Sequence, residues 1–290
     1  MTGFRVGRGS WAALAIALVA LAGPMLAHRL DPGAPVAGPA GTTTSDASDC
    51  RGQYLAGVMP AYVHPRLERR TTRICYRAFS IGYSALTRTP LWSAEKLTAA
   101  AVADAHDMAR VNDFHSDLHV VQSDQATLAD YRGSGYDRGH MAPSGDMPTA
   151  QAQAESFTLA NMVPQTPELN RHLWADVEQA VRALARTDAV IYVVTGPVFE
   201  GAELDSLGGR VAVPTSTYKA VYIPGQGAAA YIATNTAAPV LTVVSIAALM
   251  QKSGIDPFPS LDRQAEREAI ALPEPGARRH RRHNQQRSTT

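Results

Sequence analysis

The stretch Tyr136–Met147 reads "YDRGHMAPSGDM", and it suggests both a local fold and a chemistry. Residues two apart on a β-strand share a face, so Arg138 and His140 would point the same way with Gly139 between them. A cation beside an imidazole is a poor way to build a core. It is a good way to hold a phosphate and to take a proton from water. We therefore predict a strand over "DRGH", with Arg138 and His140 in an active site.

Strand and helix patterns elsewhere follow no regular βαβ order, which predicts the α+β class. The clearest helix covers Thr166–Arg186, with Thr166 as its N-cap. The preceding segment begins as a helix after residue 150 and is expected to become irregular at Asn161 and Pro164. Strands are expected at 73–86, 87–98, 189–199, 211–224 and 228–235, and a short helix at 243–254.

The two ends of the chain differ from its middle. Residues 1–27 are expected to be a signal peptide, because a charged start precedes the apolar run Trp11–Ala22; the alternative is an uncleaved amino-terminal anchor. Residues 28–49 are expected to be a flexible linker and 50–261 the functional domain. Residues 262–290 are expected to be a charged, disordered tail. Export to the periplasm or the medium follows from the signal peptide.

Charge is distributed unevenly along the 290 residues. Eight arginines and no Asp or Glu lie in the first 29 and the last 13 residues, whereas the part between carries 19 Lys and Arg against 26 Asp and Glu. A mildly acidic body that acts on a polyanion must concentrate its positive charge locally. The basic segment 278–290 is therefore expected to help capture such a polyanion in a salt-dependent way.

Cys50 and Cys75 are the two cysteines of the chain. In an exported protein such a pair favours one disulfide, whereas two buried thiols would fit a cytosolic location. Neither cysteine lies in a CxxC or Cys/His cluster, so a structural zinc site is not expected.

The helix at 166–186 carries a second set of candidate residues. Asn170, Trp174 and Glu178 are spaced i, i+4, i+8, so they turn only slowly around the helix. Asn170 could offer an amide oxygen to a hard cation such as Mg²⁺, although asparagine near a helix start is often only a cap or solvated. Glu178 lies roughly 12 Å further along the axis, so it is expected to hold a water or a ligating side chain rather than the same ion. Trp174 is expected in the core.

"DRGH" (137–140), "NMVPQ" (161–165) and "LNRHLWADVE" (169–178), in that order, resemble the signature of the DNA/RNA non-specific endonucleases. "TRTPLW", "VVTGPVF" and "VPTSTYKAV" agree with it, and the resemblance covers roughly residues 54–261. It implies a ββα-metal (His-Me finger) site in an α+β fold with a central antiparallel sheet flanked by helices. It also implies DNA and RNA as substrates. The chain has His172 where many members carry glycine.

The resemblance also implies a role for each matching residue. His140 is the general base, Asn170 is the protein ligand of Mg²⁺ (Mn²⁺ being possible), and Glu178 assists. Arg88 and Arg138 bind the phosphate and take part in catalysis, and Asn161 is a further candidate for substrate contact. Neither the oligomeric state nor an inhibitor protein can be predicted from the sequence.

The same chemistry follows from the residue types alone, independently of the family resemblance. Phosphodiester hydrolysis needs an activated water and positive charge around the phosphate, which an imidazole, a hard cation and arginines can supply. Two rival interpretations stay open, namely an exported nucleic-acid binder without activity and a metal-dependent phosphodiesterase for another substrate.

Overall fold

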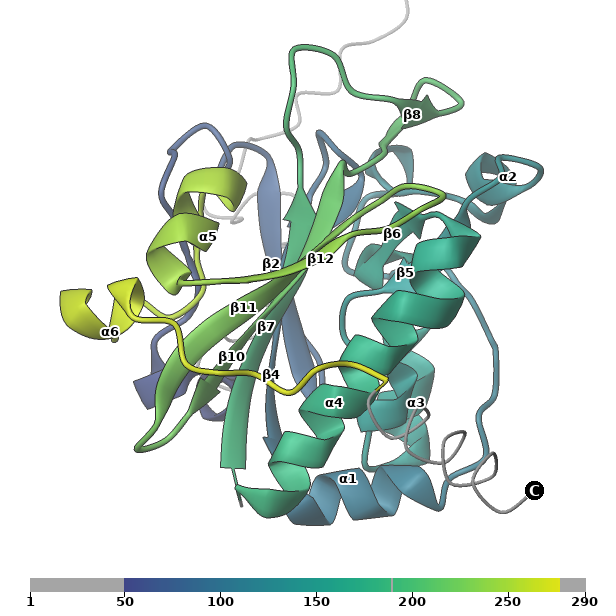
Figure 1. The fold of residues 1–290 in the computed structure, drawn as a ribbon. Coiled ribbons are helices and arrows are strands. Elements are labelled where there is room, and N and C mark those ends of the chain that lie inside the picture. Colours follow the sequence, from purple (N-terminus) through teal and green to yellow (C-terminus); the bar gives the residue numbers. More distant parts are fainter. Residues whose placement is uncertain (1–49, 189, 277–290) are drawn as a thin grey trace, which may run out of the picture. The chain divides into compact units, whose positions relative to one another are not determined.

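Seven antiparallel strands form the central sheet of the computed structural model, which describes residues 50–188 and 190–276 (Figure 1). Their order across the sheet is β12-β11-β10-β7-β4-β3-β2, so the chain crosses from one half of the sheet to the other between β4 and β7. The strands are β2 Thr71–Cys75, β3 Phe79–Ser84, β4 Thr89–Thr98, β7 Val190–Val198, β10 Ser216–Ile223, β11 Gly227–Thr234 and β12 Leu241–Val244. Strands had been expected over all of these except β12.

Helices and loops cover both faces of this sheet. One face packs against α1 (Ala99–His106) and α4 (Trp174–Thr187) through a core that includes Leu97, Val177 and Val193. The other face packs against α5 (Ile246–Ser253) and the amino-terminal segment. Burial on both sides explains why β7 is almost wholly apolar, whereas β4 carries the polar residues Ser93 and Glu95 at buried positions.

A small two-stranded sheet lies beside α4. In it β5 (Asp137–His140) pairs antiparallel with β6 (Met162–Gln165), and α4 follows β6 after a π-helical stretch at Leu169–Leu173 (Figure 1). The predicted strand over "DRGH" is confirmed, as are the helix that follows and the α+β class. This succession of two strands and a helix is the ββα arrangement expected from the sequence.

The expectation of irregular chain at 161–165 is wrong. Pro164 lies in β6 opposite Arg138. Proline fits there because β6 pairs with a strand on one side only, so its missing N–H is not needed for a second ladder. The remaining short elements are β1 Ala61–Tyr62 with β13 Ile255–Asp256, β8 Ser206–Leu207 with β9 Val211–Ala212, α2 Leu128–Tyr131, α3 Ala150–Ser156, α6 Arg263–Arg267 and the 3-10 turns 51–53, 55–57, 122–124, 144–146 and 159–161.

Cys50 and Cys75 form a disulfide, as predicted, with their Cα atoms 5.9 Å apart. The bond joins the first described residue to the end of β2. A cross-link over 25 residues of chain typically stabilises a small domain by about 3 kcal/mol.

The predicted disorder from residue 262 onward is wrong for the segment up to Gly276. After α6, the Ile270 amide donates to Ala228 O at 3.2 Å, and the Tyr231 hydroxyl donates to Pro273 O. Ile270 and Leu272 pack against the core cluster that includes α4. These contacts stabilise a segment that its charged and proline-rich composition had suggested to be unstructured. The predicted signal peptide, the linker and the basic segment 278–290 lie outside the described residues.

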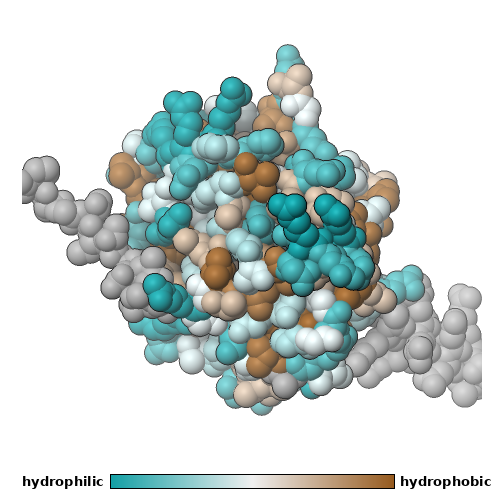
Figure 2. All heavy atoms as spheres, turned by 90° about the vertical axis from the view of Figure 1, so that its left-hand side faces the viewer, coloured by the Kyte–Doolittle hydropathy of each residue, from teal (hydrophilic) through white to brown (hydrophobic). Residues whose placement is uncertain are grey.

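The face formed by α5 and α6, on the left of Figure 1, mixes hydrophilic residues with small separate hydrophobic areas (Figure 2). Within residues 50–188 and 190–276, no helix is long and apolar enough to cross a membrane.

Candidate active site

A pocket of about 410 Å³ lies between β5, α1 and the first turns of α4. It brings together four of the predicted residues, His140, Arg138, Asn170 and Glu178. The other lining residues are Ala105, Met108, Arg110, Pro143, Ser144, Gly145, Gln153, Arg171, Ala175 and Arg182.

His140 lies at the end of β5 with its imidazole against two aromatic rings. The ring centroids of Phe157 and Phe114 are 4.9 and 5.8 Å from that of His140. Burial lowers the pKa of His140 to about 3, and the nearby Arg110 and Arg138 contribute to this shift. No hydrogen bond to its Nε2 comes from the described residues. His140 is therefore neutral at ordinary pH and can accept a proton.

Arg138 shares the His140 face of β5, as the period of the strand predicted. Its guanidinium carbon lies 4.2 Å from the centroid of the Phe114 ring, the same ring that packs on His140. Gly139, between them, lies opposite β6, where a Cβ atom would overlap the Gln165 side chain. The buried Gln165 side chain occupies the space of that Cβ atom, so this position favours glycine.

Asn170 is held by Asp137, the first residue of β5. The Asn170 amide nitrogen donates to Asp137 Oδ2 at 3.0 Å, and Arg171 donates to both oxygens of the same carboxylate at 2.7 and 2.6 Å. The Arg171 hydrogen bonds, opposed by partial burial and assisted by Asn170, keep the pKa of Asp137 below its usual value. No hydrogen bond to the Asn170 amide oxygen is found among the described residues, so that atom is free to bind a cation.

Glu178 is the acidic member of the pocket, one α-helical turn before Arg182. Its carboxylate lies 4.0 Å from the Arg182 guanidinium, which donates to the buried Asp146 at 2.7 Å. Burial raises the pKa of Glu178, whereas Arg182 and Lys219 oppose the rise. Although Asn170 and Glu178 are far apart along the helix, both side chains line the same pocket.

A buried lysine and a buried glutamate lie close together beneath this part of α4. Lys219 on β10 donates to Thr195 at 2.7 Å and lies 3.9 Å from the Glu95 carboxylate. Its ammonium is 6.0 Å from the ring centroid of Trp174, whose predicted burial is confirmed. Burial raises the pKa of Glu95 well above its usual value. Neither the pair nor its position was found from the sequence, where the two residues lie in separate strands.

Arg88 is not part of the pocket, so its predicted role in phosphate binding is not supported. It lies in the tight turn between β3 and β4 with φ +56°, and its guanidinium donates to Ser123 O at 3.1 Å. The arginine that lines the pocket in its place is Arg110, in the connection after α1. Arg110, Arg171 and Arg182 were all missed. Arg110 and Arg182 lie outside the motifs found in the sequence, and Arg171 lies within "LNRHLWADVE" but was given no role.

Asn161 is fully buried and does not face the pocket, which corrects its assignment as a substrate contact. Its amide oxygen accepts from the Ala142 amide at 3.0 Å, and its amide nitrogen donates to Ala142 O and Ser156 O, both at 2.9 Å. These bonds fix the segment that follows His140. His172 is exposed and does not line the pocket either.

Residues 61–264 match the family model described as DNA/RNA non-specific endonuclease. The chain belongs to this family.

The similarity extends to named nucleases of this kind. The chain is 39% identical over 159 residues to nuclease C1 of Cunninghamella echinulata var. echinulata, which covers 51% of this chain and 63% of the relative. It is 34% identical over 219 residues to mitochondrial endonuclease G of Bos taurus, which covers 72% and 71% of the two chains. The structure of an EndoG/EndoGI complex matches with a TM-score of 0.62 and 28% identity, covering 68% of this chain and 89% of the other.

Members of the non-specific endonuclease family depend on a divalent metal, and the pocket offers suitable donors. Hard divalent cations bind oxygen ligands, and Mg²⁺ keeps several waters of its own. The free amide oxygen of Asn170 fits such an ion, with Glu178 on the same wall of the pocket.

Proposed function

We propose that this chain is a metal-dependent, sequence-non-specific endonuclease that hydrolyses phosphodiester bonds of DNA and RNA. The observation that carries the proposal is that His140 and Asn170 line one pocket together with four arginines. A neutral base, an oxygen ligand for a cation and positive charge for a phosphate therefore meet in one place.

His140 would take the proton from the attacking water. Its imidazole is neutral, its Nε2 has no hydrogen-bond partner among the described residues, and the Phe114 and Phe157 rings pack against it and against each other. General-base catalysis of this kind typically contributes a factor of about 10² to 10⁴.

The arginines would bind the phosphate. Arg110 and Arg138 lie near His140, whereas Arg182 lies on α4 beside Glu178. Guanidinium groups match the oxygens of a phosphate with forked donors. These contacts go to the backbone of the nucleic acid and not to its bases, so we infer that the enzyme does not read sequence and accepts both DNA and RNA.

Asn170 would hold the metal, for which we propose Mg²⁺, with Mn²⁺ as a second choice. When bound, the ion would neutralise charge on the phosphate and on the leaving oxygen. Glu178 would orient water on that side of the pocket, and Asp137 would keep the amide of Asn170 turned so that its oxygen faces the ion.

We also propose that the protein is exported to the periplasm or the medium. The sequence of residues 1–27 supports this, and the Cys50–Cys75 disulfide is compatible with an oxidising compartment. Amino-terminal sequencing of protein recovered from outside the cytoplasm would test it, because an intact residue 1 would contradict cleavage.

The test of function is incubation of purified protein with supercoiled plasmid and, separately, with RNA. We expect nicked and then fragmented plasmid, together with RNA loss, in Mg²⁺ and neither with EDTA. A mobility shift of the DNA without cleavage would instead support a binder. Cleavage of a small phosphodiester but of neither polymer would support an enzyme for another substrate.

A further inference from the structure

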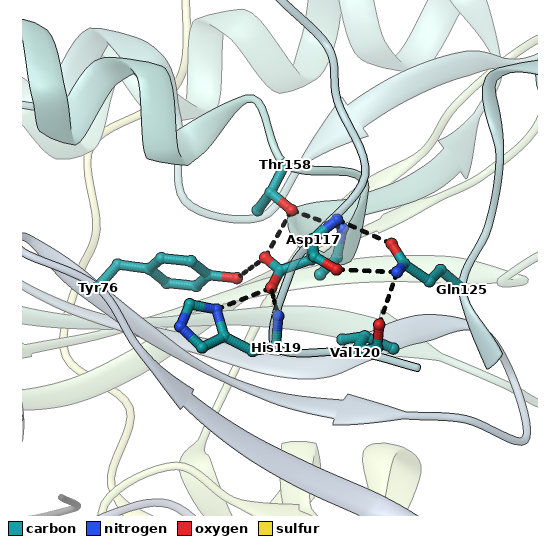
Figure 3. Close-up of polar contacts among 7 residues, drawn as sticks. Tyr76, Asp117, His119, Val120, Gln125 and Thr158 are labelled. Atoms are coloured by element: carbon teal, nitrogen blue, oxygen red, sulfur yellow. Dashed lines mark hydrogen bonds and ion pairs between the residues drawn. The ribbon is translucent and has the colours of Figure 1, made fainter. Parts of the chain in front are cut away.

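Asp117 is the centre of a buried hydrogen-bond cluster outside the pocket (Figure 3). One of its carboxylate oxygens accepts from the Tyr76 hydroxyl and, at 2.7 Å, from the Thr158 hydroxyl. The other accepts from the His119 amide at 2.8 Å and lies 2.9 Å from His119 Nδ1. Burial by itself would raise the pKa of Asp117, but these hydrogen bonds outweigh it and keep the pKa below its usual value. The group is therefore an ionised carboxylate with its acceptor positions filled.

In the same cluster, Gln125 forms hydrogen bonds with the backbone of the residues shortly before it in the chain. Gln125 accepts from the Asp117 amide at 2.8 Å and donates to the carbonyl oxygens of Asp117 and Val120 at 2.8 and 2.7 Å (Figure 3). These residues belong to the connection between α1 and α2, residues 107–127, which we call the α1–α2 loop. The side chains of Asp117 and Gln125 thus set the conformation of its second half.

Asp117 also fastens this loop to the segment that supports the catalytic histidine. Its partner Thr158 directly follows Phe157, whose ring packs edge-on against His140. The His115 amide donates to Phe157 O at 3.3 Å, beside the Thr158 contact. Phe114, the neighbour of His115 in the loop, packs on both Phe157 and His140, with ring centroids 5.0 and 5.8 Å away.

The first half of the loop carries Arg110 into the pocket. The Arg110 guanidinium carbon lies 5.3 Å from the centroid of the Phe157 ring. The Val111 amide donates to the Gln153 side chain at 2.9 Å, which ties the loop to α3. Arg110 therefore rests on the same aromatic ring that Asp117 holds in place through Thr158.

We propose that Asp117 is a positioning residue for the nuclease reaction. It fixes the α1–α2 loop on the Phe157–Thr158 segment and thereby sets the position of Arg110, and of the aromatic rings around His140, for binding the scissile phosphate. The proposal rests on the proposed function, since Arg110 must contact substrate for its position to matter. A residue that served stability alone would lack this link to Arg110.

A double-mutant cycle tests the link, with the substitutions Asp117→Asn and Arg110→Ala. Asp117→Asn alone is expected to lower kcat/KM about 5- to 100-fold and Arg110→Ala roughly 10- to 100-fold. Together they should cost clearly less than the product of the two factors, because Asp117 can no longer act through Arg110 once the arginine side chain is gone. Arg182→Ala, outside the loop, should by contrast cost the same factor with and without Asp117→Asn. Asp113→Asn is the matched control, because it makes the same change at an exposed position of the same loop.

Two further measurements keep the test decisive. If Asp117→Asn does not fold, Thr158→Val, which removes a single donor to the carboxylate, replaces it in the cycle. Amide hydrogen exchange over residues 107–116 needs no activity and should quicken at least about tenfold in the Asp117 or Thr158 variant but not in Asp113→Asn. If the proposed function is wrong, the wild-type protein will not cleave nucleic acid. The hydrogen-exchange result does not depend on cleavage and still tests the role of Asp117 in the loop. Independent, multiplying effects of Asp117 and Arg110, or unchanged exchange in the loop, would overturn the proposal.

Discussion

Asn170 donates a hydrogen bond from its amide nitrogen to Oδ2 of Asp137 at 3.0 Å, and this bond determines which way the amide faces. A carboxylate only accepts hydrogen bonds, so the nitrogen must point at Asp137 and the oxygen must point elsewhere. Asp137 begins β5 and Asn170 lies where the chain enters α4, so the bond also joins the strand to the helix. The orientation of the proposed metal ligand is therefore set by the first residue of "DRGH".

Asn170→Ala should lower the rate of Mg²⁺-dependent cleavage about 10- to 100-fold, because it removes the proposed metal ligand. High Mg²⁺ concentrations should restore part of the rate, because the rest of the pocket is intact. Asp137→Asn should act in the same direction more weakly, since the ligand remains but loses its orientation. The measurement is the Mg²⁺ activation curve of each variant. A curve for Asn170→Ala that superimposes on that of the wild type would place the ligand elsewhere.

The pH dependence of kcat/KM should show no loss of activity near pH 6.5 that is due to His140. Burial and two arginines depress the pKa of this group to about 3 in the free enzyme. Its neutral, basic form is therefore present throughout the range above that value and is lost only as the pH falls through it. A profile from pH 5 to 8 checks this. An acid limb centred near 6.5 would show that the imidazole titrates as an ordinary exposed histidine.

Arg110→Ala and Arg88→Ala should separate the two arginines by their effects. Loss of a charged donor to the phosphate typically costs about 1.5 to 3 kcal/mol, so Arg110→Ala should lower kcat/KM roughly 10- to 100-fold. Arg88→Ala removes a bond to the Ser123 carbonyl, so it should lower the melting temperature more than the rate. Cleavage assays and thermal unfolding of both variants test this. A large loss of cleavage in Arg88→Ala with little loss in Arg110→Ala would support the sequence-based prediction that Arg88 binds the phosphate.

Two truncations should distinguish the ordered end of the domain from the basic segment. Ending the chain at Glu268 removes Ile270 and Leu272 from the core, so its melting temperature should fall well below that of a chain ending at Gly276. The chain ending at Gly276, compared with the full chain, should instead show a higher KM for long DNA at low salt and a weaker salt dependence. Equal melting temperatures for the two truncated chains would contradict the packing of residues 269–276.

The local chemistry of the site was predictable from the sequence because its residues obey short-range rules. The period of a strand placed Arg138 and His140 on one face, and the capping residue at Thr166 marked the helix that carries Asn170. The strand β6 was missed because proline disfavours a strand that pairs with neighbouring strands on both sides. Pro164 is acceptable here because β6 pairs with β5 alone.

The parts that the sequence did not reveal depend on long-range placement. Arg88 and Arg110 both lie in connections, and nothing local states that the β3–β4 turn leads away from the pocket while the α1–α2 loop returns to it. Asn161 shows the same limit, since its three hydrogen bonds join it to Ala142 and Ser156, in the connection between β5 and β6. The pair Glu95 and Lys219 becomes visible only when β4, β7 and β10 are placed side by side.

The central claim, that His140 is the base of a phosphodiester hydrolase, is tested most directly by single-turnover cleavage of DNA by His140→Ala. The affinity for DNA in EDTA and the melting temperature are measured beside it, because the substitution removes the base and no phosphate contact. We predict a cleavage rate about 10² to 10⁴ times lower than that of the wild type, with DNA affinity and fold retained. A folded, DNA-binding variant that keeps more than about half of the wild-type rate would contradict the assignment.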